Sequence, residues 1–120
     1  MYARVTTYDG RPEDFTWAKD VFMAQVGEKV LQMDGCTGVL LMMDHSTGRS
    51  LSITLWESET SVASSRADAA RLRKDAASFS GSQVTDVTEY TVALAELDSV
   101  THAPVPLVSE SSTLMPRPTC

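Results

Sequence analysis

The hydrophobic pattern of the first 35 residues predicts a strand followed by a long helix. Residues 2–8 are rich in Tyr, Val and Thr, which favour strands. Beyond them, apolar residues recur at spacings of three and four, which predicts a helix of about six turns with one apolar stripe. The stripe consists of Phe15, Ala18, Phe22, Val26, Val30 and Met33. Pro12 suits the first helical position, and Gly35 suits a left-handed cap at the end.

The next apolar segment begins at Cys36 and has no polar interruption from Val39 to Met43. Adjacent side chains of a strand point to opposite faces, so both faces of this strand are apolar and the pattern predicts burial on both sides. One layer of helices covers only one face of a sheet. We therefore expect a second copy of the chain to cover the other face.

Residues 49–57 predict a third strand with clean alternation. One face carries Leu51, Ile53 and Leu55, and the other carries Ser50, Ser52, Thr54 and Trp56. The turn-forming residues 44–48 join this strand to the preceding one as a hairpin. The second face is mixed in polarity, which indicates either a cavity or a wet edge.

Ser58 suits the N-cap of a second helix, with Glu59 in its first turn and an Ala-rich stripe running to about Ser78. Gly81 interrupts, and residues 84–96 predict a last strand. Its expected apolar face consists of Val84, Tyr90, Val92 and Leu94. The element order predicts an α+β fold of the ferredoxin-like β-α-β-β-α-β type with an antiparallel sheet.

The 120 residues suit one domain, residues 1–96, followed by a tail, residues 97–120, that holds four of the five prolines and many Ser and Thr. By composition alone the tail is typical of a disordered segment. If it is ordered, it must pack on another surface, and we expect that surface to be the partner subunit.

Composition and charge exclude some classes of function. The chain is 42% apolar and 22% charged, as is ordinary for a soluble domain, with a net charge of −6 that disfavours nucleic acid. The basic residues Arg66, Arg71, Arg73 and Lys74 alternate with Asp68 and Asp75, which indicates a solvated helix face. Because the sequence shows neither a membrane-spanning apolar run nor a secretory signal, we expect a cytoplasmic protein that binds no membrane.

The two cysteines, Cys36 and Cys120, are too few for a disulfide scaffold or a metal cluster. Cys36 starts an apolar strand, where a thiol usually behaves as a small hydrophobic group. We expect neither a metal nor another cofactor.

One stretch of sequence resembles a known family. It comprises Gly38-Val-Leu-Leu, the turn Asp44-x-x-Thr47-Gly48, and the strand that ends in Trp56-Glu57-Ser58. With the Ala- and Arg-rich helix that follows, it resembles the antibiotic biosynthesis monooxygenase family of dimeric α+β barrels, over roughly residues 2–95. The resemblance implies a homodimer in which two sheets pack face to face, with a pocket between sheet and helices in each subunit.

The resemblance implies chemistry only loosely. Some members of this family oxygenate quinol- or anthrone-like aromatics without a cofactor, others bind and degrade haem, and many have no known activity. We expect a cofactor-independent monooxygenase of a small aromatic substrate. The alternatives are a haem-binding protein and a non-catalytic dimer that binds a small ligand, and fold alone does not choose among them.

The mixed strand face supplies the first candidate site residues. The indole of Trp56 can stack on a flat aromatic ligand. Ser52 and Thr54 on the same face can either form hydrogen bonds with that ligand or pair across the strands. Trp56 is equally compatible with a core or interface position. Trp17 lies beside the helical stripe, where packing at the helix edge is favoured over ligand contact. Tyr90 can act as a phenol donor, although a strand Tyr that faces a partner sheet explains it as well.

The histidines give little support for a haem site. His45, a catalytic candidate beside Trp56 and Tyr90, falls in the hairpin turn, where a solvated side chain is typical. His102 falls in the tail. By the resemblance, haem-degrading relatives place their iron-binding His on the second helix, where this chain offers Arg66, Arg71, Arg73 and Lys74 instead. The sequence shows no carboxylate pair, phosphate loop or Ser-His-Asp arrangement, and this absence fits both a cofactor-independent enzyme and a non-catalytic protein.

Overall fold

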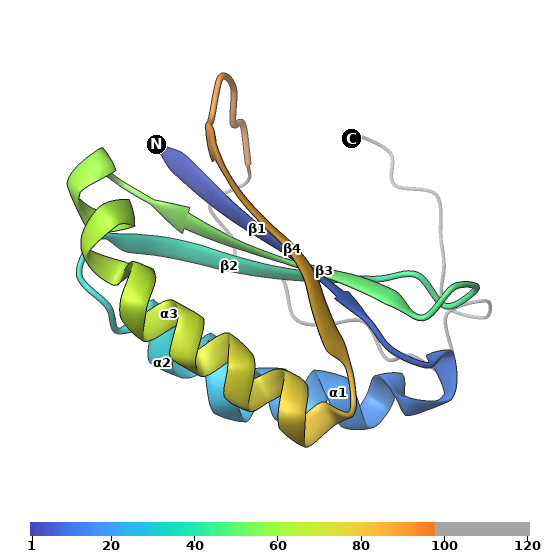
Figure 1. Ribbon diagram of the computed structural model, residues 1–120. Helices are drawn as coiled ribbons and strands as arrows, with labels where there is room; N and C mark the ends of the chain where they lie inside the picture. The colour runs from blue at the N-terminus through green and yellow to red at the C-terminus, as the bar shows by residue number, and fades with distance from the viewer. Residues whose placement is uncertain (98–120) are drawn as a thin grey trace.

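The computed structural model describes residues 1–97, in which a four-stranded antiparallel sheet lies on a layer of helices (Figure 1). The sheet order is β2-β3-β1-β4, so the two edges are β2 and β4. The strands are β1 (Tyr2–Asp9), β2 (Cys36–Met43), β3 (Arg49–Trp56) and β4 (Gln83–Thr91). The predicted α+β class and the ferredoxin-like element order are confirmed.

The first helical segment follows the predicted stripe but is not uniform. It comprises η1 (Pro12–Asp14), α1 (Phe15–Phe22), the π-helical turn η2 (Met23–Gly27) and α2 (Glu28–Leu31). Phe15, Phe22, Val26 and Val30 are buried as the spacing predicted. Gly35 has a positive φ of 83°, and a Cβ at this position would clash with the side chain of Ser61. Gly35 therefore permits both the turn and the close approach of the next helix.

The second predicted helix is α3 (Glu59–Ser80), and its ends are defined by their caps. The Ser58 hydroxyl accepts a hydrogen bond from the Ser61 N–H at 3.1 Å, and the Ser61 hydroxyl accepts one from the Ser58 N–H at 3.2 Å. Gly81 closes the helix in the left-handed conformation. The expected Ser58 cap is confirmed, and the helix ends two residues after the predicted Ser78.

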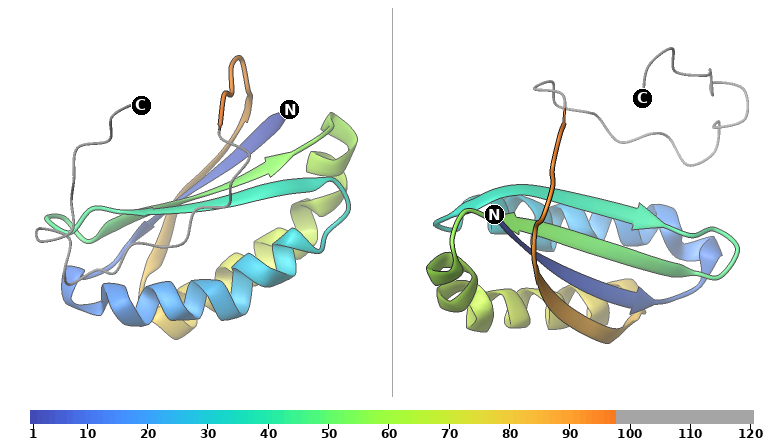
Figure 2. Two further views of the ribbon diagram at one scale, coloured as in Figure 1. Left: turned by 180° about the vertical axis from the view of Figure 1, so that it is seen from behind. Right: turned by 90° about the horizontal axis from the view of Figure 1, so that it is seen from above.

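The helices cover one face of the sheet only, and the right panel of Figure 2 looks onto the other, which we call the open face. Cross-strand pairing assigns alternate residues of each strand to the two faces. The helix-covered face carries Arg4, Thr6, Tyr8, Ser52, Thr54 and Trp56. The open face carries Val5, Leu40, Met42, Leu51, Ile53, Leu55 and Tyr90.

Both faces of the sheet are apolar at β2, and they differ in whether helices cover them. On the open face, Leu40 and Met42 of β2 are 48% and 46% exposed. The apolar cluster that the helices build with Val39, Leu41 and Trp56 lies on the covered face. The predicted apolar character of both faces of β2 is therefore present in the structure. The second copy expected on the open face stays a prediction.

Strand β4 differs from the prediction in its end and in its faces. It ends at Thr91 instead of residue 96, because Thr91 pairs with Tyr2, where its sole partner strand β1 begins. Thr7 pairs with Asp86 whereas Tyr8 pairs with Val84, so Thr85 is an extra residue in a β-bulge. The bulge turns Val84 toward the helices while Tyr90 stays on the open face. The expectation that they share a face is wrong.

Residues 98–120 lie outside the described residues. The predicted packing of the tail, together with His102 and Cys120, therefore stays a prediction. Within residues 1–97, no helix combines the length and the apolar character needed to cross a membrane.

Candidate functional site

Buried polar side chains form a layer between the sheet and the helices. Arg4 is 2% exposed, and Thr6, Ser52, Thr54 and Ser65 are also buried. The layer arises because Arg4 pairs with Thr54 and Thr6 pairs with Ser52 across β1 and β3, which turns all four side chains toward the helices. Buried polar groups are costly unless they are hydrogen-bonded, so the partners of each one matter.

Arg4 is the most connected member of this layer. Its guanidinium donates to the Val62 carbonyl at 2.8 Å, to the Ser65 hydroxyl at 3.3 Å and to the Glu89 carboxylate at 3.0 Å. The same guanidinium lies 5.3 Å from the ring centroid of Trp56, within the range of a cation–π contact. Arg4 thus ties β1 to β4 and α3 and has a counter-charge for its buried cation.

Glu89 supplies that counter-charge from β4. It accepts hydrogen bonds from Arg66 at 2.7 Å and from Arg4, and these contacts hold the pKa of the Glu89 carboxyl below its ordinary value. The hydrogen bonds from Arg66 are the largest cause. Glu89 is therefore ionised at neutral pH and keeps the Arg4 charge balanced.

Trp56 is fully buried, and its indole N–H donates to the Thr54 hydroxyl at 2.9 Å. The single donor of the indole is already used, so a ligand can contact Trp56 only through the ring. A ligand role for Trp56, Ser52 and Thr54 stays a prediction. The structure nevertheless brings these three side chains together, as the alternation of β3 predicted, and they line one cavity.

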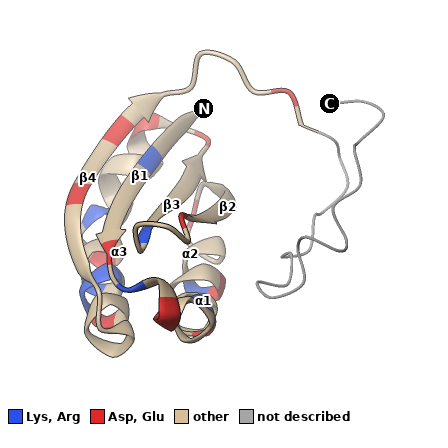
Figure 3. Ribbon diagram, turned by 90° about the vertical axis from the view of Figure 1, so that its right-hand side faces the viewer, with Lys and Arg blue, Asp and Glu red and all other residues tan. Residues whose placement is uncertain are grey.

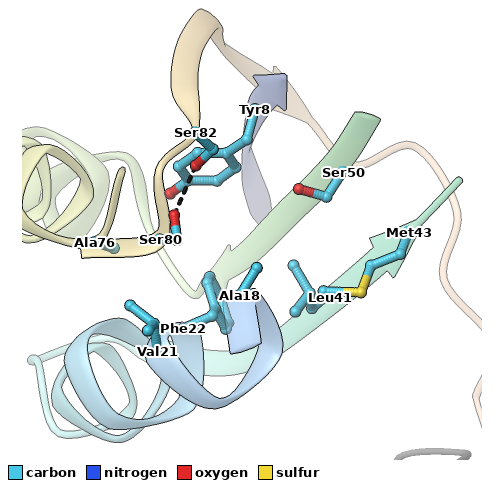
Figure 4. Close-up of a pocket in the computed structure, with 10 residues that line it drawn as sticks. All are labelled: Tyr8, Ala18, Val21, Phe22, Leu41, Met43, Ser50, Ala76, Ser80 and Ser82. Carbon is cyan, nitrogen blue, oxygen red and sulfur yellow. Dashed lines mark hydrogen bonds between the residues drawn. The ribbon is translucent and has the colours of Figure 1, made fainter. Parts of the chain in front are cut away.

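Two small cavities lie within this region. The inner cavity lies beside the polar layer and has a volume of about 10 Å³. It is lined by Arg4, Thr6, Val26, Val30, Ser52, Thr54, Trp56, Ala69 and Arg73. The end cavity, shown in Figure 4, has a volume of about 20 Å³. Each is close to the size of one water molecule.

Tyr8 lines the end cavity with Phe22, Leu41 and Ser50 (Figure 4). It is 5% exposed, and its hydroxyl has no hydrogen-bond partner among the described residues. Burial raises the pKa of the Tyr8 phenol more than the nearby Ser52 hydroxyl, which lies outside hydrogen-bond geometry, and the charge of Arg73 lower it, so the group is protonated at neutral pH. Tyr8 therefore offers an unused donor to whatever enters this cavity.

Arg73 is one of the basic residues predicted to lie on a solvated face of α3, and the structure differs for this residue. Arg66 and Arg71 do face solvent, paired with Glu89 and Asp68 respectively. Arg73 is partly buried, and burial followed by the neighbouring charge of Arg4 lowers the pKa of its guanidinium. Two cations thus share the inner cavity. For Arg73 the predicted solvation is wrong, because the helix turns this side chain toward the sheet.

The other predicted site residues lie apart from the cavities. Trp17 is 59% exposed and donates to the Phe79 carbonyl at 3.1 Å. His45 is exposed and packs edge to face on Phe15, with ring centroids 5.0 Å apart. Tyr90 is exposed on the open face, opposite to the cavities. The structure does not bring these three side chains together with Trp56.

The described residues contain neither a metal-binding cluster nor an activated thiol. No group of three His, Cys, Asp or Glu side chains within residues 1–97 is placed to hold a metal ion. Burial raises the pKa of the Cys36 thiol, which keeps it protonated at neutral pH. Cys36 is therefore a poor nucleophile, as expected of a small hydrophobic group.

The fold matches solved structures of one class. A monooxygenase from Streptomyces coelicolor, the product of the gene ActVA-Orf6 in complex with the ligand nanaomycin D, aligns with a TM-score of 0.60 at 17% identity, over 82% of this chain and 92% of that one. An antibiotic biosynthesis monooxygenase gives 0.57 at 17% identity, over 80% of this chain and all of that one. A structure from Mycobacterium tuberculosis aligns with a TM-score of 0.55 at 19% identity, over 83% of this chain and 98% of that one.

These matches define the class of fold. The chain has the α+β fold of antibiotic biosynthesis monooxygenase structures, and the resemblance drawn from the hairpin sequence is confirmed at this level. No protein-family model matches the sequence.

The curated relatives carry no assigned activity. An uncharacterized protein of Mycobacterium tuberculosis is 33% identical over 107 residues, which is 85% of this chain and 43% of the relative. A second uncharacterized protein of that organism is 32% identical over 85 residues, which is 68% of this chain and 36% of the relative. The chain thus spans less than half the length of these relatives.

Proposed function

We propose that this chain belongs to the antibiotic biosynthesis monooxygenases and acts as a homodimeric, cofactor-independent monooxygenase of small quinol- or anthrone-like aromatics. The observation that carries the proposal is the hydroxyl of Tyr8, which lies in a cavity between sheet and helices without a hydrogen-bond partner in residues 1–97. A solved monooxygenase in complex with the ligand nanaomycin D has the same fold, which supports this choice.

The chemistry requires a substrate that can reduce dioxygen itself. An anthrone-like CH₂ group beside a carbonyl loses a proton, and the resulting carbanion transfers electrons to O₂ and forms a C–O bond. Loss of water from the hydroperoxide leaves a second carbonyl, so that CH₂ and O₂ give C=O and H₂O. The protein's part is to favour the anion and to position proton donors around it.

The residues of the two cavities suit that part. Arg4 and Arg73 provide positive charge beside the inner cavity, which favours the deprotonated substrate. The protonated phenol of Tyr8 can donate a hydrogen bond to the substrate carbonyl and so stabilise the negative charge that develops on its oxygen. The face of Trp56 supplies apolar contact for the aromatic rings.

The present size of the cavities sets a condition on this function. Space for single water molecules does not admit a tricyclic substrate, so the helices must move away from the sheet when one binds. The π-helical turn Met23–Gly27 lies within the helix that covers the cavities, and Val26 of this turn lines the inner one. Such turns are rare within α-helices and often occur at functional sites.

The homodimer in this proposal draws its support from the open face. Monomeric proteins rarely expose large contiguous apolar patches, and Leu40, Met42, Leu51, Ile53 and Leu55 form one on β2 and β3. A second copy packed on that face would bury the patch. It would also leave the helix side, and thus the cavities, free to take a substrate.

Oxygen consumption with an anthrone as substrate tests the activity. After subtraction of the buffer rate, Tyr8→Phe should lower kcat/KM by about tenfold or more, because it removes one donor to the developing charge. Tyr2→Phe is the matched control on the same strand, since Tyr2 packs against the core cluster and lines neither cavity. A wild-type rate equal to that of buffer, or a Tyr8→Phe rate equal to wild type, would refute the proposal.

A further inference from the structure

A third cavity lies outside the polar layer, in the groove between α3 and β4. The volume of this α3–β4 groove is about 490 Å³, far more than that of the two cavities beneath the sheet. It is lined by Ala70, Arg73, Lys74, Ala77, Gln83, Val84 and Val87. The groove is therefore the one space among these three that admits an organic molecule without rearrangement.

Its walls combine a small-residue side with an apolar side. On the α3 side, the small side chains of Ala70 and Ala77 leave space in the groove. On the β4 side, the side chains of Val84 and Val87 are 37% and 39% exposed. Val84 faces the groove because the bulge at Thr85 reverses the alternation of β4. A flat apolar body placed here would bury both valines, which is favourable at about 25 cal/mol per Å² of apolar surface.

The charged residues of the groove have one sign. Arg73 and Lys74 line it, and neither forms an ion pair with another residue in the described part of the chain. Figure 3 shows acidic positions along β4, and of these Glu89 is already paired with Arg4 and Arg66. Burial lowers the pKa of the Arg73 guanidinium most, and the charge of the nearby Arg4 lowers it more than the Glu89 carboxylate raises it. An anion in the groove would therefore relieve the remaining repulsion between like charges.

We propose that the α3–β4 groove binds a small organic anion with a flat apolar body, such as an aromatic carboxylate. The carboxylate pairs with Arg73 and Lys74, and the ring system lies against Val84 and Val87. Arg guanidinium groups bind carboxylates through two parallel hydrogen bonds, which gives this end of the ligand its orientation. The inference goes beyond the monooxygenase proposal, because occupancy of the groove requires no oxygen chemistry.

The first test compares two ligands of equal shape. Calorimetric titration at low salt and neutral pH uses naphthoate, which is anionic, and naphthamide, which is neutral. Naphthoate should bind about tenfold more tightly, and Arg73→Gln should remove about that factor for naphthoate alone. Arg71→Gln is the control two residues away, since Arg71 is exposed and paired with Asp68. Equal affinities for the two ligands, or an unchanged naphthoate affinity in Arg73→Gln, would overturn the proposal.

The second test fills the groove without changing its charge. Ala70→Leu places a larger side chain into the space and should abolish naphthoate binding, whereas Ala67→Leu, at another exposed position of α3, should leave it intact. Thermal unfolding of each variant checks that the fold is retained. Binding that survives Ala70→Leu would place the ligand elsewhere. If neither naphthoate nor naphthamide bound to the wild type, the groove would not be available to such ligands. Either outcome would refute the inference, and neither bears on oxygen consumption.

Discussion

The two faces of this sheet invert the usual relation between polarity and burial. The covered face carries an arginine, a tyrosine and several hydroxyls, yet all of them are buried. The open face carries leucines, an isoleucine and a methionine, and two of the apolar residues of β2 are about half exposed. For a single subunit both faces carry a cost, but the buried charge of Arg4 is compensated within the subunit, whereas the apolar side chains of Leu40 and Met42 on the open face stay about half exposed.

The costs differ in kind. On the covered face, the Arg4 charge is offset by Glu89 and by hydrogen bonds to α3, which makes the interior specific in geometry. The apolar surface of the open face has no directional partner, and any apolar surface of matching shape will satisfy it. The covered face thus suits recognition of a ligand, and the open face suits association with a copy of the chain.

The largest expected effect concerns the open face. Leu40→Asp places a charge where the second copy is proposed to pack, and burying an unpaired carboxylate should raise the dimer dissociation constant by about a thousandfold, or ~4 kcal/mol. Light scattering coupled to gel filtration measures the mass across a dilution series. Leu31→Asp is the control on the helix side, because Leu31 is 51% exposed against 48% for Leu40. A wild-type chain that is monomeric at all concentrations would contradict the dimer.

The next effect in size concerns the buried charge of the covered face. Glu89→Gln leaves the Arg4 cation without its counter-charge and should lower the free energy of unfolding by about 2 kcal/mol. The control Asp68→Asn breaks the exposed pair with Arg71 and should cost less than about 0.5 kcal/mol. Chemical denaturation of both variants measures the difference, and equal losses would show that Arg4 is not held by Glu89.

The same carboxylate predicts how stability depends on pH. The pKa of Glu89 is lower in the folded chain than in the unfolded one, so its stabilisation is present above the unfolded value and is lost as pH falls through the folded value. The free energy of unfolding should therefore decline from about pH 5 downward. Glu89→Gln should flatten this decline, and an unchanged pH profile in the variant would exclude Glu89 as its source.

The smallest expected effect compares two threonines on opposite faces. Thr54→Val removes the acceptor of the Trp56 indole N–H and should cost about 1.5 kcal/mol, since the donor is left buried and unpaired. Thr88→Val, on the open face opposite Val5, should change stability by less than about 0.5 kcal/mol. Thermal unfolding of the two isosteric variants checks the contrast. Similar losses at both sites would show that the indole has another partner.

Much of the fold was predictable because local signals and packing agree. Ser58 and Gly81 mark the ends of α3, and the stripe from Phe15 to Val30 identifies the buried side of the first helix. The alternation of β3 placed Ser52, Thr54 and Trp56 together, and the interpretation of a mixed face as a cavity agrees with what the helices enclose.

The rest of the site depended on information that no single segment contains. Arg4 and Tyr8 occupy alternate positions of β1, but the sequence does not say which face of that strand the helices cover. Arg73 differs from Arg71 only in the direction that it takes from the helix axis. No Gly, Pro or Asn marks the bulge at Thr85, so the placement of Val84 and Tyr90 on opposite faces could not be predicted.

That bulge makes this part of β4 tolerant of a change in the length of its gene. Loss of the single codon for Thr85 would leave Val84 opposite Tyr8 and Asp86 opposite Thr7, so regular alternation would keep Val84 toward the helices and Asp86 on the open face. One deletion would thus remove the bulge without moving a residue between the two surfaces and without altering any charged group. Natural variants with and without this residue would be expected to share the same groove residues.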